Sequence, residues 1–186
     1  MSLLQNVKKT GGKRALRMLF YALQGWGKTT FLSQVGEDNP DSVLLLRTEN
    51  GTGRTIKMNY IEITCIDDLF TAFRELAETE HQYKVVGIDT ITGLEPMVAQ
   101  QVLQQWNGER NTNLQNLEAI GYGKGYKLAR TVWRDIAQWI TYLAEYKGVS
   151  VILLSHAILK TFNNPGGDNY DWWQISLDKE LSLIHI

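Results

Sequence analysis

The residue types best suited to chemistry lie near the start of the chain, in the segment Ala22–Thr29. It reads Ala-Leu-Gln-Gly-Trp-Gly-Lys-Thr and follows an apolar run. The spacing matches the phosphate-binding loop pattern G-x-x-x-x-G-K-[ST], with alanine at the first glycine position. Backbone N–H groups and a helix dipole hold phosphates in such loops, so the segment predicts an ATP site. Lys28 would bind the β- and γ-phosphates, and Thr29 would bind Mg²⁺. The residues expected to contact the nucleotide are Gly25, Trp26, Gly27, Lys28, Thr29 and Thr30.

Two carboxylates are candidates to complete this site. Asp89 ends the apolar run Val85–Asp89, where it could hold Mg²⁺, although capping of the next helix is an alternative. In AAA-type ATPases a catalytic glutamate normally follows this aspartate, but here Thr90 follows. Glu49, just beyond the apolar run Val43–Leu46, is the best candidate to polarise the attacking water. An exposed glutamate in a loop is the other interpretation.

A histidine occupies a comparable place later in the chain. His156 follows the apolar run Val149–Leu154. A neutral imidazole there could donate a hydrogen bond to the γ-phosphate and respond to its loss. The alternative is a histidine that packs at the end of a strand.

The segment Gly121–Tyr126 combines glycines with tyrosines and a lysine, and further cations follow it. Aromatic rings stack on bases and cations pair with phosphates, so this mixture suits single-stranded nucleic acid. The alternative is a glycine-rich helix start with a solvated basic face. The residues predicted to bind nucleic acid are Tyr122, Lys124, Tyr126 and Lys127.

The segment Phe162–Trp173 contains a second group of aromatic residues. Its first half, Asn163–Asp168, is rich in turn-forming residues, and Tyr170, Trp172 and Trp173 follow. We expect a mobile loop whose aromatic side chains either stack on bases or pack against a further part of the protein.

These candidates need elements that position them, and apolar runs alternate with helical periodicity along most of the chain. We expect strands at 17–21, 43–46, 61–65, 85–89 and 149–154, and helices at 29–35, 67–79, 94–106 and 124–146. This βαβ alternation predicts a parallel sheet with helices on both faces. The carboxyl ends of parallel strands line one crevice, so Lys28, Glu49, Asp89 and His156 should converge there.

Composition limits the class of protein. The 186 residues are 44% hydrophobic and 21% charged, with a net charge of −1, which argues against binding nucleic acid by bulk charge. No apolar stretch is long enough to span a bilayer, and we expect a cytoplasmic protein. The one cysteine, Cys65, lies in an apolar run and should be a small buried hydrophobe. A basic cluster near the start comprises Lys8, Lys9, Lys13, Arg14 and Arg17.

The order of these motifs resembles phage-type RecA-like ATPases, including AAA-domain phage proteins and single-strand annealing proteins of the Sak class. The similarity covers roughly residues 13–180 and rests on the segments Gly25–Phe31, Glu49–Gly51, Val86–Thr90, Gly121–Tyr126 and Ser155–Ala157. It implies an α/β RecA-like P-loop NTPase fold, with a mainly parallel central sheet flanked by helices. It also implies ATP, Mg²⁺, single-stranded DNA and a homo-oligomer.

The resemblance also implies a role for each matched position. Lys28 and Thr29 match the Walker A pair, and Asp89 matches the Walker B aspartate. Glu49 matches the catalytic glutamate, and His156 matches the γ-phosphate sensor. For a phage-encoded protein, the compartment would be the host cytoplasm.

We therefore expect a protein that binds and hydrolyses ATP and acts on single-stranded DNA in phage recombination or annealing. The alternatives are a nucleotide-gated assembly or binding protein without DNA activity, and a helicase-like or packaging motor. We divide the chain into a basic arm (1–14), an incomplete ATPase core (15–180) and a non-native tail (181–186). That tail resembles translated sequencing adapter, so we expect the natural core to be truncated at its C-terminal end.

Overall fold

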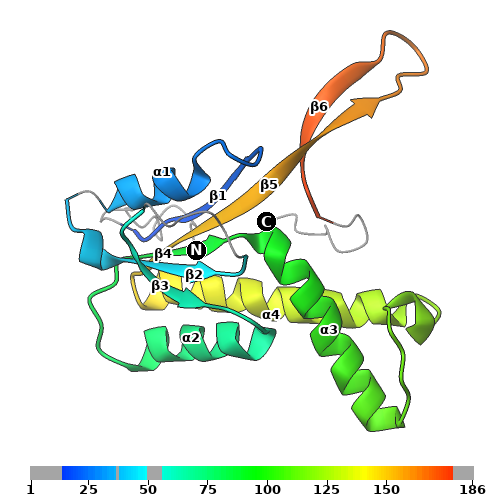
Figure 1. Ribbon diagram of the computed structural model, residues 1–186, viewed down its shortest axis with the longest axis horizontal. Coiled ribbons are helices and arrows are strands. Elements are labelled where there is room, and N and C mark those ends of the chain that lie inside the picture. Colours follow the sequence, from blue (N-terminus) through cyan, green and yellow to red (C-terminus); the bar gives the residue numbers. More distant parts are fainter. Residues whose placement is uncertain (1–13, 37, 50–55, 178–186) are drawn as a thin grey trace, which may run out of the picture.

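A mainly parallel sheet forms the centre of the fold, as the sequence predicts. The computed structural model describes residues 14–36, 38–49 and 56–177. The strands are β1 (Arg17–Ala22), β2 (Val43–Arg47), β3 (Asn59–Glu62), β4 (Val85–Asp89), β5 (Ser150–Phe162) and β6 (Tyr170–Ile175). Their order is β1-β5-β4-β2-β3, with all neighbours parallel, and β6 pairs antiparallel with β5 (Figure 1).

Helices cover both faces of this sheet. They are α1 (Lys28–Val35), α2 (Ile66–Glu78), α3 (Ile91–Arg110) and α4 (Lys124–Tyr146), with the short 3₁₀ helices η2 (Pro40–Ser42) and η3 (Glu118–Ile120). Helix α1 lies on one face, and α2 and α4 lie on the other (Figure 1). Side chains alternate along β2, so Leu44 and Leu46 join the larger core beneath α2, α3 and α4. Val43 and Leu45 join the smaller core beneath α1. Burial on both faces explains why this strand is continuously apolar.

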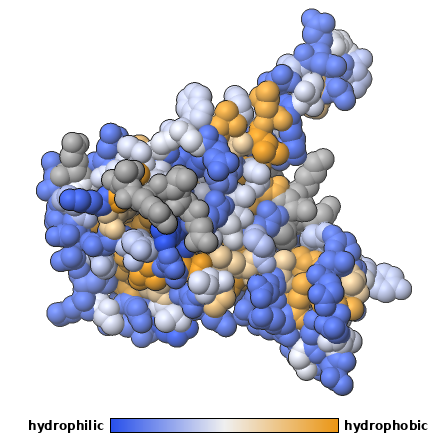
Figure 2. Space-filling model, viewed as in Figure 1, coloured by the Kyte–Doolittle hydropathy of each residue, from blue (hydrophilic) through white to orange (hydrophobic). Residues whose placement is uncertain are grey.

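The expected loop at Phe162–Trp173 is instead largely a β-hairpin. Strand β5 continues past its predicted end at Leu154 to Phe162, and β6 returns beside it. Phe162 pairs with Tyr170, and their ring centroids lie 5.2 Å apart. Such cross-strand aromatic pairs stabilise antiparallel strands, and the turn-forming residues form only the connection between the two strands, at 163–169. The hairpin projects from the body, with hydrophobic side chains on its near half and a hydrophilic tip (Figure 2).

The start of α2 also differs from expectation. The helix begins at Ile66, one residue before the predicted start, and its N-cap is Cys65. The carboxylate of Asp68 accepts hydrogen bonds from the backbone N–H groups of Thr64 and Cys65, at 2.9 and 3.2 Å. These bonds, with one from the Thr64 hydroxyl, lower the pKa of Asp68. Cys65 is exposed, so the prediction that it is a buried hydrophobe is wrong. An N-cap lies outside the helix and need not face the core.

Arg17, grouped with the basic cluster in the sequence, lies in β1. Its guanidinium donates to the hydroxyl of Thr141 in α4 at 2.8 Å and lies 3.5 Å from the carboxylate of Glu145. Lys8, Lys9 and Lys13, with the tail 181–186, lie outside the described residues. None of the described helices is both long and apolar enough to cross a membrane.

One glycine allows α1 to lie close to the sheet. A Cβ at Gly87 in β4 would lie 2.1 Å from Cδ2 of Leu32, a fully buried side chain of α1. Any larger residue would therefore displace the Leu32 side chain and disturb the packing of α1 against the sheet.

We predict that Gly87→Ala lowers the free energy of unfolding by about 1–3 kcal/mol, because it overpacks the α1 core. Urea denaturation measures this change. Gly108→Ala is the matched control, since a Cβ at this exposed site in α3 meets no atom within 4 Å. Alanine should stabilise that helix by up to about 1 kcal/mol. Equal effects of the two substitutions would contradict the packing argument.

Candidate active site

The loop between β1 and α1 has the backbone shape of a phosphate-binding loop. Gly25 and Gly27 have φ angles of 82° and 80°, in the left-handed region that L side chains rarely adopt. Gly27 is the N-cap of α1 and has no side chain to occupy the N–H groups of the first turn. These N–H groups can therefore donate hydrogen bonds to an anion. The side chain of Trp26 is 73% exposed and does not fill the loop.

Lys28 is the first residue of α1, directly after this loop, and is only 6% exposed. Its ammonium donates to the carbonyl oxygens of Ala22 and Leu23, at 3.1 and 3.0 Å, and to Nδ1 of His156 at 3.3 Å. Burial lowers the pKa of Lys28, while the carboxylates of Asp89 and Glu49 act in the opposite direction. The ammonium of Lys28 is thus held by three acceptors, two backbone carbonyls and one imidazole nitrogen.

Thr29 and Asp89 form the expected pair. The hydroxyl of Thr29 donates to Oδ2 of Asp89 at 2.5 Å. Oxygen ligands of this kind fit Mg²⁺, which usually binds one or two protein groups and completes its shell with water and substrate phosphates. The described residues contain no group of three or more His, Cys, Asp or Glu side chains able to hold a metal, and a Mg²⁺ site of this type needs none.

Glu49 and His156 extend the cluster. His156 Nε2 lies 3.0 Å from Oε2 of Glu49, and the hydroxyl of Thr90 donates to Oε1 at 2.6 Å. An ammonium only donates, so Nδ1 of His156 must accept from Lys28. The neutral tautomer with the proton on Nε2 therefore satisfies both partners, because it donates to Glu49.

The environment of Glu49 favours its charged form. Burial raises the pKa of this carboxyl, but hydrogen bonds from Thr90 and His156 and the positive charge of Lys28 outweigh burial. The pKa of Glu49 is therefore lower than usual, and the group is an anion at neutral pH. An ionised carboxylate can accept a proton or orient a water molecule.

The sheet explains why these side chains meet. β4 lies between β2 and β5, and Ala22 of β1 is in register with His156 of β5. Asp89 ends β4, Glu49 lies two residues past β2, and His156 lies on β5. The structure thus brings Lys28, Glu49, Asp89 and His156 together at one edge of the sheet, where the sequence predicts them.

Sequence reasoning missed the threonines that support this cluster. Thr48 cross-links β2 and β4, since its Oγ1 donates to the carbonyl of Thr90 at 2.6 Å and accepts from its N–H at 2.8 Å. The hydroxyl of Thr92 accepts from the backbone N–H of His156 at 3.2 Å. The sequence signal was only a group of threonines next to strand ends, which is too common to be specific.

The predicted nucleic-acid residues lie elsewhere, at the start of α4 (Figure 1). Tyr122 is 98% exposed, and Lys124 and Lys127 are also exposed. Tyr126 differs, because its ring packs against the main core and its hydroxyl donates to the carboxylate of Glu118. This environment gives Tyr126 a packing role and leaves Tyr122 as the more accessible ring.

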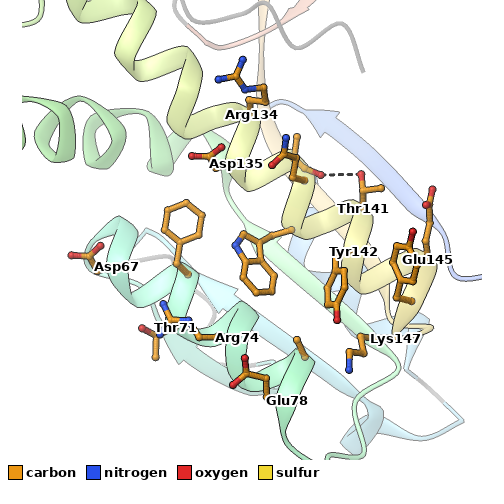
Figure 3. A pocket seen from close by; sticks show the side chains of 16 residues that line it. Asp67, Thr71, Arg74, Glu78, Arg134, Asp135, Thr141, Tyr142, Glu145 and Lys147 are labelled. Carbon is orange, nitrogen blue, oxygen red and sulfur yellow. Dashed lines mark hydrogen bonds between the residues drawn. The ribbon is translucent and has the colours of Figure 1, made fainter.

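A broad groove of about 1200 Å³ lies between α2 and α4 (Figure 3). Aromatic and charged side chains of both helices line it, among them Tyr142, Arg74 and Glu78. It contains none of the cluster around Lys28. This groove is therefore separate from the phosphate-binding loop.

The fold and this cluster define a P-loop ATPase-type domain, and comparison with known families agrees. The family model described as AAA domain matches residues 14–184. The chain therefore belongs to the AAA domain family, which indicates nucleotide binding and hydrolysis. No curated protein matches the chain.

We predict that Lys28→Ala weakens ATP binding by about 100-fold, because charge-assisted hydrogen bonds to phosphate are lost. Calorimetric titration with ATP and Mg²⁺ measures the affinity. Lys124→Ala removes an exposed lysine outside the cluster and should leave the affinity unchanged. Retained affinity in Lys28→Ala would count against the phosphate-binding loop.

Proposed function

We propose that this chain is an ATPase whose nucleotide cycle controls its grip on single-stranded DNA, in phage recombination or annealing. The observation that carries the ATPase part is the hydrogen-bonded chain from Lys28 through His156 to Glu49. This chain links Lys28, which is predicted to bind phosphate, to Glu49, the predicted base, through the imidazole of His156.

In this proposal, Lys28 and the N–H groups of the loop bind the phosphates of ATP, and Thr29 and Asp89 hold Mg²⁺. When bound, Mg²⁺ neutralises charge on the phosphate oxygens. Glu49 orients the attacking water and accepts its proton, while the bond between the γ-phosphorus and the ADP oxygen breaks. His156 responds to phosphate, because it shares hydrogen bonds with both Lys28 and Glu49.

The DNA part rests on two projecting elements. Side chains of paired residues lie on the same face of a hairpin, so Lys160, Phe162, Tyr170 and Trp172 share one face of β5–β6. This face offers three aromatic rings and one cation, the combination that stacks on bases and pairs with phosphate. The second element is the start of α4, with exposed Tyr122, Lys124 and Lys127.

Strand β5 connects the proposed ATP site with the proposed DNA-binding hairpin. His156 lies in β5, and the same strand continues to Phe162 in the hairpin. If His156 is displaced when phosphate binds, the displacement would therefore be transmitted along β5 to the aromatic face of the hairpin. This continuity supports coupling between ATP and DNA over a protein that only binds nucleotide.

The protein also assembles as a homo-oligomer in this proposal. Trp26 is a large exposed side chain within the phosphate-binding loop, and a second copy packed there would cover it. Light scattering with and without ATP tests this, since ATP should increase the measured molar mass of the protein assembly.

We predict that Glu49→Gln binds ATP normally but hydrolyses it about 100-fold more slowly, because the amide cannot accept a proton from water. The measurement is phosphate release at saturating ATP. Glu78→Gln, at an exposed site in α2, should retain wild-type turnover. Wild-type turnover in Glu49→Gln would move the base to another residue.

We also predict that Trp172→Ala and Tyr122→Ala each weaken binding of single-stranded DNA by about 1–3 kcal/mol, because a stacked base is lost. Fluorescence anisotropy of a labelled oligonucleotide measures this. Tyr146→Ala, at the opposite end of α4, is the control and should change nothing. Failure of single-stranded DNA to bind or to stimulate hydrolysis would favour the assembly protein, and a preference for duplex DNA would favour a motor.

A further inference from the structure

The first turn of α3 touches both partners of the imidazole–carboxylate pair. Thr90, the N-cap of α3, donates its hydroxyl hydrogen to Oε1 of Glu49 at 2.6 Å. Thr92, two residues later, accepts from the backbone N–H of His156. One helical turn therefore contacts both residues that form the Glu49–His156 hydrogen bond.

The direction of the Thr90 hydroxyl is determined by its other partner. Its oxygen accepts from the backbone N–H of Gly93 at 3.1 Å, in the usual manner of an N-cap. The hydroxyl hydrogen is therefore free to point at Glu49, and a carboxylate accepts it. Thr90 is also only 2% exposed, so water does not compete for this bond.

The backbone of Thr90 is itself held in place. Thr48 binds both its N–H and its carbonyl, so residue 90 is tied to the strand that leads into Glu49. Gly93 allows Glu49 to lie against α3, since a Cβ there would fall 2.8 Å from Cγ of Glu49 and 2.5 Å from the hydroxyl oxygen of Thr48.

The two carboxylate oxygens of Glu49 thus have different donors, Thr90 on Oε1 and His156 on Oε2. Two donors on opposite oxygens prevent rotation of the carboxylate plane, whereas one donor would allow it. His156 also accepts a hydrogen bond from Lys28, so a movement of Lys28 could disturb its bond to Glu49. The bond from Thr90 does not involve Lys28.

We infer that Thr90 is a positioning residue, which keeps the carboxylate of Glu49 in its catalytic orientation while His156 changes partners. The inference rests on the proposed role of Glu49 as the base. It also explains what the threonine directly after Asp89 does, at the position where AAA-type ATPases carry the glutamate itself.

The test uses Thr90→Val, which keeps the shape but has no hydroxyl, and Thr90→Ser, which restores the donor. We expect Thr90→Val to lower kcat about 10-fold or more, with KM for ATP changed less than about 2-fold, and Thr90→Ser to recover most of the loss. Without the hydrogen bond the pKa of Glu49 rises, so the acid limb of the kcat profile should move to higher pH. A wild-type kcat and pH profile in Thr90→Val would overturn the inference.

A double-mutant cycle separates positioning from loss of structure. If Thr90 acts through Glu49, then Thr90→Val should not slow the Glu49→Gln variant further. An equal loss in both backgrounds would show a structural role and overturn the inference. Wild-type turnover in Glu49→Gln alone would instead overturn the proposed function, so the two failures are distinguishable.

Should Thr90→Val not fold, Thr90→Ala also removes the donor, and adds neither volume nor charge beside Glu49. It should lower kcat while the circular dichroism spectrum stays unchanged, and a wild-type kcat would again overturn the inference.

Discussion

The hydrogen bonds of His156 are the interaction on which the site depends. One ring nitrogen accepts from the ammonium of Lys28, and the other donates to the carboxylate of Glu49. A neutral imidazole is the side chain that can serve a cation and an anion in this way, because it carries one acceptor and one donor. Protonation of His156 would put a second donor against Lys28 and break this arrangement.

The parallel sheet makes this arrangement possible. Parallel strands present their carboxyl ends at one edge, so residues far apart in sequence share that edge without long loops. Packing beneath the strands then determines the distances. Gly87 allows α1 to approach, and α1 carries Lys28 and Thr29 beside Asp89. The packing of the apolar core therefore also sets the distances within the polar cluster.

The projecting parts of the molecule follow a different principle. The hairpin β5–β6 extends beyond the sheet and keeps large aromatic side chains partly in solvent. Isolated two-stranded hairpins are only marginally stable in water, so the cross-strand aromatic pair is important to this ribbon. The strand that carries His156 also carries this hairpin, which places the polar cluster and the exposed aromatic face on one continuous backbone.

The sequence by itself determined the phosphate-binding loop, the alternation of strands and helices, and the positions of Glu49 and Asp89 at or just past strand ends. These features depend on local patterns, namely glycine positions, apolar runs and their borders. His156, expected just past the end of a strand, lies instead within β5, which continues to Phe162. Only the tertiary structure decided that Cys65 caps a helix, that Phe162 and Tyr170 pair across a hairpin, that Tyr126 is packed, and that Thr90 holds Glu49. Each depends on a neighbour supplied by the folded chain, and the direction of a hydroxyl or the cover over a ring cannot be read from residue types alone.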